Sequence, residues 1–238
     1  MACGSCVHKS KAGFFSSLSS LSAGACGYGS MALGLNGGYA AASSSAILGG
    51  GGVACGASLQ VVCKSRGICS SRGAKVILTD LNRGNDTGLV LSRPAFVAMA
   101  KHGKSKELMK LGTVDVEYKS RIPCEYKDRN LSIRVEEKSQ WPNYLAIKFL
   151  YQGGQTDIVA VDVAQLGSWN WRFMNRVYGP VWHMTQVPAG PLQLRMVVTS
   201  SYSGKWVWAD KEVLPANWMI GSIYDLRVQI TAVALTSE

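Results

Sequence analysis

The seven cysteines are the residues of this chain whose type and spacing most directly suggest chemistry, as metal ligands, thiols or disulfides. Cys3 and Cys6 have the C-x-x-C spacing of metal and redox pairs, but Cys63 and Cys69 complete no zinc pattern and no histidine pair follows them. The spacing therefore favours disulfides, and with them an oxidising compartment. All seven lie in the first 124 residues: Cys3, Cys6, Cys26, Cys55, Cys63, Cys69 and Cys124.

Composition argues against several other kinds of site. His8, His102 and His183 are scattered and suit neither a metal site nor a Cys–His nucleophile pair, so we predict no metal. Residues 1–124 hold 14 Lys and Arg against 5 Asp and Glu, whereas residues 125–238 hold 11 against 10. A basic surface attracts polyanions, but no nucleic-acid-binding motif is present. We therefore expect no nucleic acid partner and keep an acidic polysaccharide as a candidate.

The elements that must position these residues are short strands. In the first half, alternation predicts strands over 75–80 and 112–118, and four successive glycines place a loop at 49–52. A short helix is predicted over 39–48, and short helices or turns over 96–100 and 105–111. In the second half, alternation predicts strands over 131–136, 144–151, 159–163, 192–198 and 226–230, a pattern typical of a β-sandwich.

The chain divides into two parts with different composition. The seven tryptophans all follow residue 140, in the half without cysteines. We predict a cystine-stapled domain over 1–125 and a domain with an aromatic-rich core over 126–238. No apolar segment is long enough to span a membrane.

Export is expected from the cysteine content. Two glycosylation sequons, at Asn85 and Asn130, agree with it. No apolar leader opens the chain, and we expect that a signal peptide was trimmed or omitted.

Several motifs resemble those of plant expansins, and above all the expansin-like A subfamily. They include Gly-Ala-Cys-Gly-Tyr-Gly at 24–29, Cys-Gly-Ala-Ser at 55–58 and Leu-Thr-Asp-Leu-Asn at 78–82. Val-Glu-Tyr at 116–118, Ile-Pro-Cys at 122–124, Pro-Asn-Tyr-Leu-Ala at 142–146 and Asp-Ile-Val-Ala-Val-Asp at 157–162 extend the resemblance over nearly the whole chain.

The resemblance implies an all-β fold: an N-terminal six-stranded double-psi β-barrel, like that of family-45 glycoside hydrolases, followed by an immunoglobulin-like β-sandwich that binds polysaccharide. It also implies a secreted, monomeric plant cell-wall protein that loosens contacts between cellulose and matrix glycans without appreciable hydrolysis. No cofactor is implied.

The resemblance further implies the disulfides Cys26–Cys55 and Cys63–Cys69. A third bridge would join position 58 to Cys124, but this chain has Ser58. Cys124 is then either a free buried thiol, with Cys3 bonded to Cys6, or it pairs with Cys3 or Cys6.

A hydrolase of the related kind needs two carboxyl groups about 6.5–9.5 Å apart. The resemblance matches one of them to Asp80. It places Gly88, Leu89 and Val90 where the family has His-Phe-Asp, so the second carboxylate is missing. We therefore predict no hydrolase activity. Asp80 is a vestigial groove residue or a turn-capping Asp at a strand end.

A sugar-binding platform needs aromatic rings on the outer face of a sheet. Alternation places Tyr144 and Lys148 outward, and the resemblance adds Tyr178 and one of Trp169 or Trp171. Trp206 and Trp208 share a strand face, and Trp182 and Trp218 are predicted to pack in the core or loops. The lysines of a basic run are a pectin-binding candidate or simply a solvated helix face: Lys101, Lys104, Lys106 and Lys110.

Three functions follow from these patterns. The first is a secreted, non-enzymatic wall protein that binds polysaccharide and loosens it. The second is a wall-binding module without loosening activity. The third is a weak glycoside hydrolase.

Overall fold

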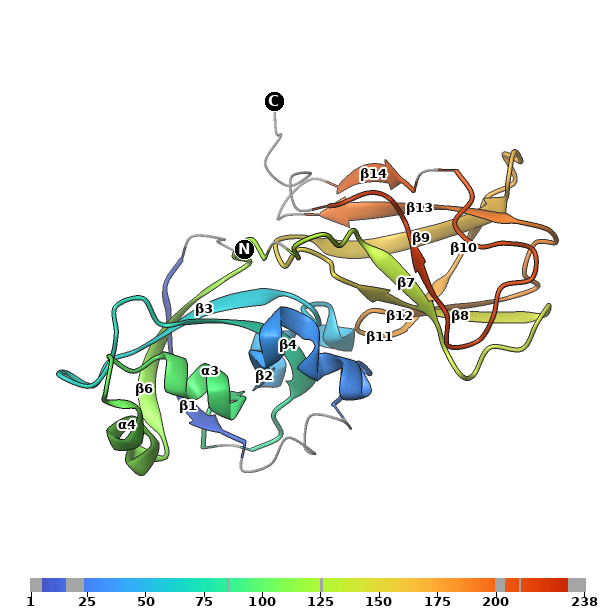
Figure 1. The fold of residues 1–238 in the computed structure, drawn as a ribbon. Coiled ribbons are helices and arrows are strands. Elements are labelled where there is room, and N and C mark those ends of the chain that lie inside the picture. Colours follow the sequence, from blue (N-terminus) through green and yellow to red (C-terminus); the bar gives the residue numbers. More distant parts are fainter. Residues whose placement is uncertain are drawn as a thin grey trace.

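The computed structural model describes residues 6–15, 24–84, 86–124, 126–199, 204–209 and 211–230. These residues form the predicted all-β structure, with few helices. Figure 1 shows a closed barrel built by the first half of the chain and two further sheets built by the second half. No helix in the described ranges is long and apolar enough to cross a membrane.

The barrel closes six strands in the order β1-β5-β2-β4-β3-β6. Two neighbouring pairs, β1 with β5 and β2 with β4, are parallel, and the other pairs are antiparallel. This is the predicted double-psi barrel. Aliphatic side chains such as Val61, Leu78 and Leu89 are buried in its core. The strands are β1 (His8–Phe14), β2 (Ala40–Ser43), β3 (Ser58–Cys63), β4 (Ala74–Leu81), β5 (Leu89–Leu91) and β6 (Val114–Ser120).

Short helices connect the barrel strands. The predicted helices or turns near 96–100 and over 105–111 correspond to α3 (Arg93–Ala98) and α4 (Ser105–Leu111). The helix predicted over 39–48 is wrong in its first half, because residues 40–43 form β2 and the helix is limited to α2 (Ser45–Leu48). Ala is a good helix former, but here β2 lies between β4 and β5 and all four of its residues are buried. Three 3-10 turns complete this half: η1 (Gly29–Leu33), η2 (Leu35–Gly38) and η3 (Gly50–Gly52).

The second half forms the predicted immunoglobulin-like sandwich of two antiparallel sheets. Its core includes Ile133, Phe149, Val161 and Met196, which the alternating pattern placed inward. The four-stranded sheet has the order β10-β9-β13-β14, and the five-stranded sheet β11-β12-β8-β7-β15. The strands are β7 (Ser132–Val135), β8 (Tyr144–Leu150), β9 (Asp157–Gln165), β10 (Arg172–Phe173), β11 (Asn175–Tyr178), β12 (Val181–Thr185), β13 (Leu192–Thr199), β14 (Gly204–Trp208) and β15 (Ile223–Asp225).

The strand predicted over 226–230 is wrong. Residues 223–225 pair with β7 instead, and residues 226–230 form no strand. Leu226 and Ile230 are nevertheless fully buried in the sandwich core. The alternating pattern therefore predicted the burial of these two side chains correctly. It did not predict that the segment lacks the hydrogen-bonded pairing that defines a strand.

The barrel packs against the outer face of the five-stranded sheet. Leu150, at the end of β8, belongs to the hydrophobic cluster of the barrel, and Tyr151 and Tyr178 pack against the same cluster. Figure 1 accordingly shows the five-stranded sheet on the side of the sandwich that faces the barrel. We call this contact the seam.

Candidate functional site

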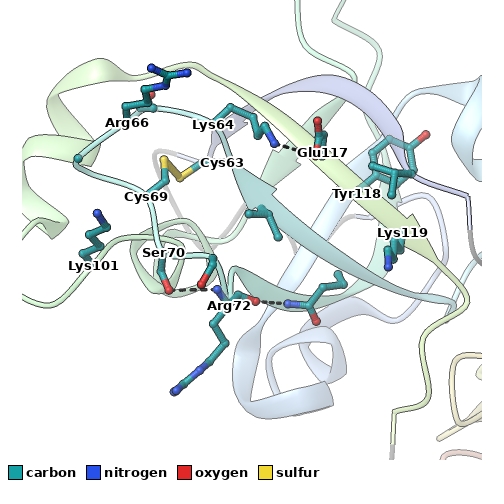
Figure 2. A pocket seen from close by; sticks show the side chains of 16 residues that line it. Cys63, Lys64, Arg66, Cys69, Ser70, Arg72, Lys101, Glu117, Tyr118 and Lys119 are labelled. Atoms are coloured by element: carbon teal, nitrogen blue, oxygen red, sulfur yellow. Dashed lines mark hydrogen bonds and ion pairs between the residues drawn. A yellow bond between two sulfur atoms is a disulfide. The ribbon is translucent and has the colours of Figure 1, made fainter.

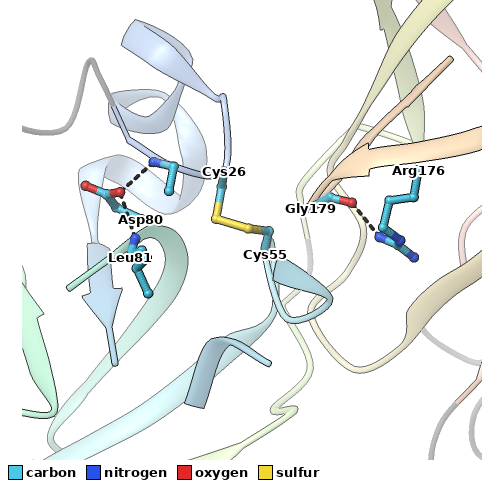
Figure 3. The surroundings of a disulfide bond; sticks show 7 residues. Cys26, Cys55, Asp80, Leu81, Arg176 and Gly179 are labelled. Atoms are coloured by element: carbon cyan, nitrogen blue, oxygen red, sulfur yellow. Dashed lines mark hydrogen bonds between the residues drawn. A yellow bond between two sulfur atoms is a disulfide. The ribbon is translucent and has the colours of Figure 1, made fainter. Parts of the chain in front are cut away.

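Glycines at the seam allow the backbones of the barrel and the sandwich to approach each other very closely. Gly179 donates its N–H to the carbonyl of Gly51 at 2.7 Å. A Cβ at Gly179 would lie 2.8 Å from Sγ of Cys55, and one at Gly52 would lie 2.6 Å from the ring of Tyr178. Figure 3 shows Gly179 beside the Cys26–Cys55 disulfide. A side chain at either position would force Cys55 or Tyr178 to shift.

Polar contacts also cross the seam. Tyr28 from the barrel side is fully buried and hydrogen-bonds to Gln152 of the sandwich, and burial raises the pKa of its phenol well above the usual range. Arg121 forms an ion pair with Asp157, whose side chain is buried. These contacts tie barrel and sandwich together at several points.

Asp80 lies at the end of β4, on the barrel side of the seam. Its Oδ1 accepts hydrogen bonds from the backbone N–H of Ala25 at 2.5 Å and of Leu81 at 2.7 Å (Figure 3). The carboxylate therefore caps the turn at residues 24–25, which is the structural alternative predicted for it. Both hydrogen bonds are accepted by one of its two oxygens.

The positions expected to hold a second carboxylate have no ionisable group. Gly88 precedes β5, and Leu89 is completely buried in the barrel. Asp86, the nearest acidic residue in the sequence, is exposed at a bend. Among the described residues, no group of three or more His, Cys, Asp or Glu is placed to hold a metal ion.

Tyr144 lines a shallow hollow at the end of the five-stranded sheet that the barrel does not cover. Its ring packs on His183, with 5.5 Å between ring centroids. The hollow has a volume of about 660 Å³. The rest of its lining is polar: the side-chain amides of Gln140, Asn143 and Gln186, together with Lys138 and Thr185.

Tyr178 shares the outer face of this sheet with Tyr144 but lies at the seam. Its partner in the neighbouring strand is Val181, and Val181 in turn pairs with Lys148. His183 lies between Val181 and Thr185, which is the partner of Tyr144. Tyr144 and Tyr178 therefore lie at the two ends of one strip on the outer face of the sheet, which runs through Thr185, His183 and Val181.

Lys148 lies on the outer face of its strand, as alternation predicts, but this part of the face is not an open surface. It does point away from the sandwich core, but the barrel covers it and its side chain is 4% exposed. Its Nζ pairs with Glu136 at 2.9 Å, and Glu136 also pairs with Arg134 at 3.1 Å. Arg134 in turn hydrogen-bonds to Glu137 and lowers the pKa of that carboxyl to about 2.

The four-stranded sheet carries an aromatic cluster on its outer face, which we call the tryptophan ladder. The guanidinium of Arg195 lies 4.4 Å from the ring centroids of both Trp171 and Trp206, and the centroids of Trp206 and Trp208 are 6.2 Å apart. Asp162 pairs with Arg195 at 2.8 Å. The structure thus places Trp171 on a different sheet from Tyr144.

Arg195 covers one face of Trp171 and one face of Trp206, whereas the side chains of Trp206 and Trp208 remain about half exposed. Trp169 stands apart from it on the β9–β10 connection and is 91% exposed. Sequence reasoning placed Trp206 and Trp208 on one strand face but missed Arg195. Alternation places Arg195 on the outer face of β13, but its pairing with Trp208 depends on the register between β13 and β14. Trp182 and Trp218 are buried, as predicted.

The predicted disulfides Cys26–Cys55 and Cys63–Cys69 are both present. Cys124 is a free, buried thiol, so its re-pairing with Cys3 or Cys6 is excluded. Burial raises the pKa of this thiol. Cys6 is disulfide-bonded, while Cys3 and the sequon residue Asn85 lie outside the described residues. The other sequon residue, Asn130, is partly buried and donates to Asp225 at 3.1 Å.

Comparison with known proteins places this geometry in a family. Residues 131–215 match the family described as the Expansin C-terminal domain. The chain is 54% identical over 235 residues to expansin-like A2 of Arabidopsis thaliana, covering 98% of this chain and 88% of that protein. It is 55% identical over 241 residues to expansin-like A3 of Oryza sativa subsp. japonica, covering 99% and 87% respectively.

The fold is similar to that of an apo expansin from Clavibacter michiganensis, with a TM-score of 0.69 at 21% identity over 94% of this chain and 98% of that one. A mutant of the bacterial protein in complex with cellohexaose gives a TM-score of 0.67 at 20% identity, with the same coverage. Barrel and sandwich together are thus the two-part all-β fold of the expansin type. The chain belongs to the expansin family, within its expansin-like A group.

Proposed function

We propose that this chain is a secreted plant cell-wall protein that binds cellulose and matrix glycans as a monomer and loosens their contacts without hydrolysis. Residues 1–125 would act as the barrel domain and residues 126–238 as the carbohydrate-binding domain. Membership of the expansin family supports this proposal. The complex of the bacterial expansin with cellohexaose indicates the chemical class of the ligand.

The hollow around Tyr144 is the observation that carries the binding proposal. A phenol ring offers an apolar face on which the C–H face of a pyranose can stack. The amides of Gln140, Asn143 and Gln186 border the ring and can both donate to and accept from sugar hydroxyls. An uncharged β-glucan meets both requirements. We propose that its chain runs along the strip from Tyr144 toward Tyr178 at the seam, with Trp169 as a further exposed contact.

Retention on insoluble cellulose tests this surface. We expect Tyr144→Ala to lose at least half of the bound protein at subsaturating load, because the stacking ring is removed. The matched control is Trp208→Ala, which removes an exposed aromatic ring, 53% accessible, from the opposite sheet. If Trp208→Ala loses retention and Tyr144→Ala keeps it, the ladder face binds the polymer and the present assignment is wrong. Circular dichroism of both variants establishes that they are folded.

Creep of heat-killed cell walls under constant load tests loosening. Asp80→Asn keeps a side-chain oxygen that can accept from Ala25 and Leu81, so it removes the charge and preserves the cap. We expect extension by the wild-type protein, reduced extension by Asp80→Asn, and no release of reducing sugar by either. Equal extension by both proteins would limit Asp80 to its structural role. Binding without any extension would identify a wall-binding module instead, and sugar release would identify a hydrolase.

A further inference from the structure

A second candidate site lies on the barrel, away from the strip of the five-stranded sheet. It is an open pocket of about 880 Å³ lined by residues of β3, the β3–β4 connection and β6, together with Val7 and Lys101 (Figure 2). Neither Asp80 nor any residue of the sandwich lines it. We call it the basic pocket.

Positive charge dominates the lining. Five cationic side chains are present against one carboxylate, Glu117, which pairs with Lys64 at 2.8 Å. None of the other four forms an ion pair with a described residue: Arg66, Arg72, Lys101 and Lys119. Figure 2 shows these side chains on different sides of the pocket rather than converging on one point. Such a distribution suits a ligand with repeated negative charges better than a single small anion.

The pocket is held in shape before any ligand arrives. The Cys63–Cys69 disulfide closes the loop that carries Lys64 and Arg66. Lys101 is tied to the same loop, because its N–H donates to the carbonyl of Ile68 at 2.8 Å. Ordering in advance lowers the entropy lost when a ligand binds.

The remaining lining favours a sugar polymer over a nucleic acid. The hydroxyls of Ser65, Ser70 and Ser71 and the amide of Gln60 line the pocket together with the cations. The Gln60 amide donates to the carbonyl of Arg72, and the Ser70 hydroxyl accepts from the N–H of Arg72. The aromatic ring of the lining, that of Tyr118, is half-buried and already stacks on His8 at 5.2 Å. Single-stranded nucleic acids need a series of free rings for base stacking, which this pocket does not offer.

We propose that the basic pocket binds a linear polyuronate, a polysaccharide with one carboxylate on each sugar. The choice of a polysaccharide rests on the proposed wall function, and the choice of an acidic one rests on the charge of the pocket. The site would let one molecule engage an acidic polymer at the barrel and a neutral glucan at the sandwich.

The test is titration of the full chain with a de-esterified oligogalacturonide, followed by calorimetry at low and at physiological salt. We expect the double variant Arg66→Gln/Arg72→Gln to bind at least about ten-fold more weakly, because two charge-assisted contacts are lost. The matched control is Lys106→Gln/Lys110→Gln, which removes the same charge from the exposed face of α4, outside the pocket. We expect the control to change affinity less than about two-fold, since exposed distant charges are screened.

Three outcomes would overturn the proposal. Equal weakening in the two double variants would mean that net charge, rather than the pocket, sets the affinity. Binding of a single-stranded oligonucleotide with the same affinity and the same dependence on Arg66 and Arg72 would identify a general polyanion site. The methyl-esterified oligomer must not bind, because its carboxylates are blocked. Cellulose retention of Arg66→Gln/Arg72→Gln should equal that of the wild type, which separates this proposal from the one concerning Tyr144.

Discussion

Ser58 occupies a completely buried position at the start of β3, and its hydroxyl donates to the carbonyl of Ile122. Ile122 lies two residues before Cys124, whose thiol is free and buried. The hydroxyl thus stands close to the place where the related proteins are expected to carry a disulfide. A hydrogen bond replaces a covalent link between β3 and the segment that leads into the sandwich.

We expect Ser58→Cys to form a disulfide with Cys124 and to raise the free energy of unfolding by about 2–4 kcal/mol, chiefly because the unfolded chain is constrained. Differential scanning calorimetry measures the gain, and thiol titration of the denatured protein measures the bond. The variant has one cysteine more than the wild type but should titrate one thiol fewer. A gain in the free energy of unfolding that persists after complete reduction would contradict the disulfide explanation. The variant Ser58→Ala is the control for loss of the hydroxyl.

Single residues show what the sequence could and could not predict about the site. The pairs Cys26–Cys55 and Cys63–Cys69 followed from the family pattern. Lys148 was placed on the correct face of its strand by alternation, yet alternation says nothing about a second domain covering that face. Arg195 was missed because its contacts depend on the register between β13 and β14, which adjacent residues in the sequence do not reveal.

Among the elements, strands whose sequence alternates between apolar and polar residues were predictable, and a strand without alternation was not. β8 and β13 alternate between apolar and polar residues and were found within a residue or two. β2 consists of Ala and Ser and is buried throughout, so it has no alternation to detect. The pairing of β1 with β5 is parallel and joins residues far apart in the sequence, and the family resemblance alone indicated the barrel that contains it.

The tryptophan ladder should stabilise the packing of β14, the edge strand of the four-stranded sheet, against β13. We expect Arg195→Met to lower the free energy of unfolding by roughly 1–3 kcal/mol. It removes two cation–π contacts and leaves the partly buried Asp162 without its partner.

Urea unfolding measures this effect, and Arg195→Lys is the matched variant. Lysine keeps a charge for Asp162 but loses the planar stacking group, so its loss should be smaller. Cellulose retention should not change in either variant. Unaltered stability of Arg195→Met would show that the ladder does not support the sheet.

For the whole molecule, the seam decides whether the two halves behave as one body. Gly179 has a φ of 54°, and a side chain there would be strained by the backbone and would press on Cys55. We expect Gly179→Ala to cost about 1–2 kcal/mol for the left-handed conformation and more for the displaced contact. Calorimetry should show a lower Tm and a broader or divided transition.

Gly167→Ala is the control for this experiment. Gly167 has a φ of 80°, and nothing lies within 4 Å of a Cβ built there. It therefore carries the backbone strain without the steric contact. If both variants lose the same stability, the seam does not depend on the close approach of Gly179 to Cys55.

The glycine seam also has a mechanical consequence. Because backbone meets backbone there, with a buried tyrosine and an ion pair beside it, little freedom remains for a hinge. If such a protein held one polymer on its sandwich and another on its barrel, it would connect the two polymers as a single rigid body. Tension in one polymer would be passed on as displacement of the other, and the energy for that movement would come from the load on the wall.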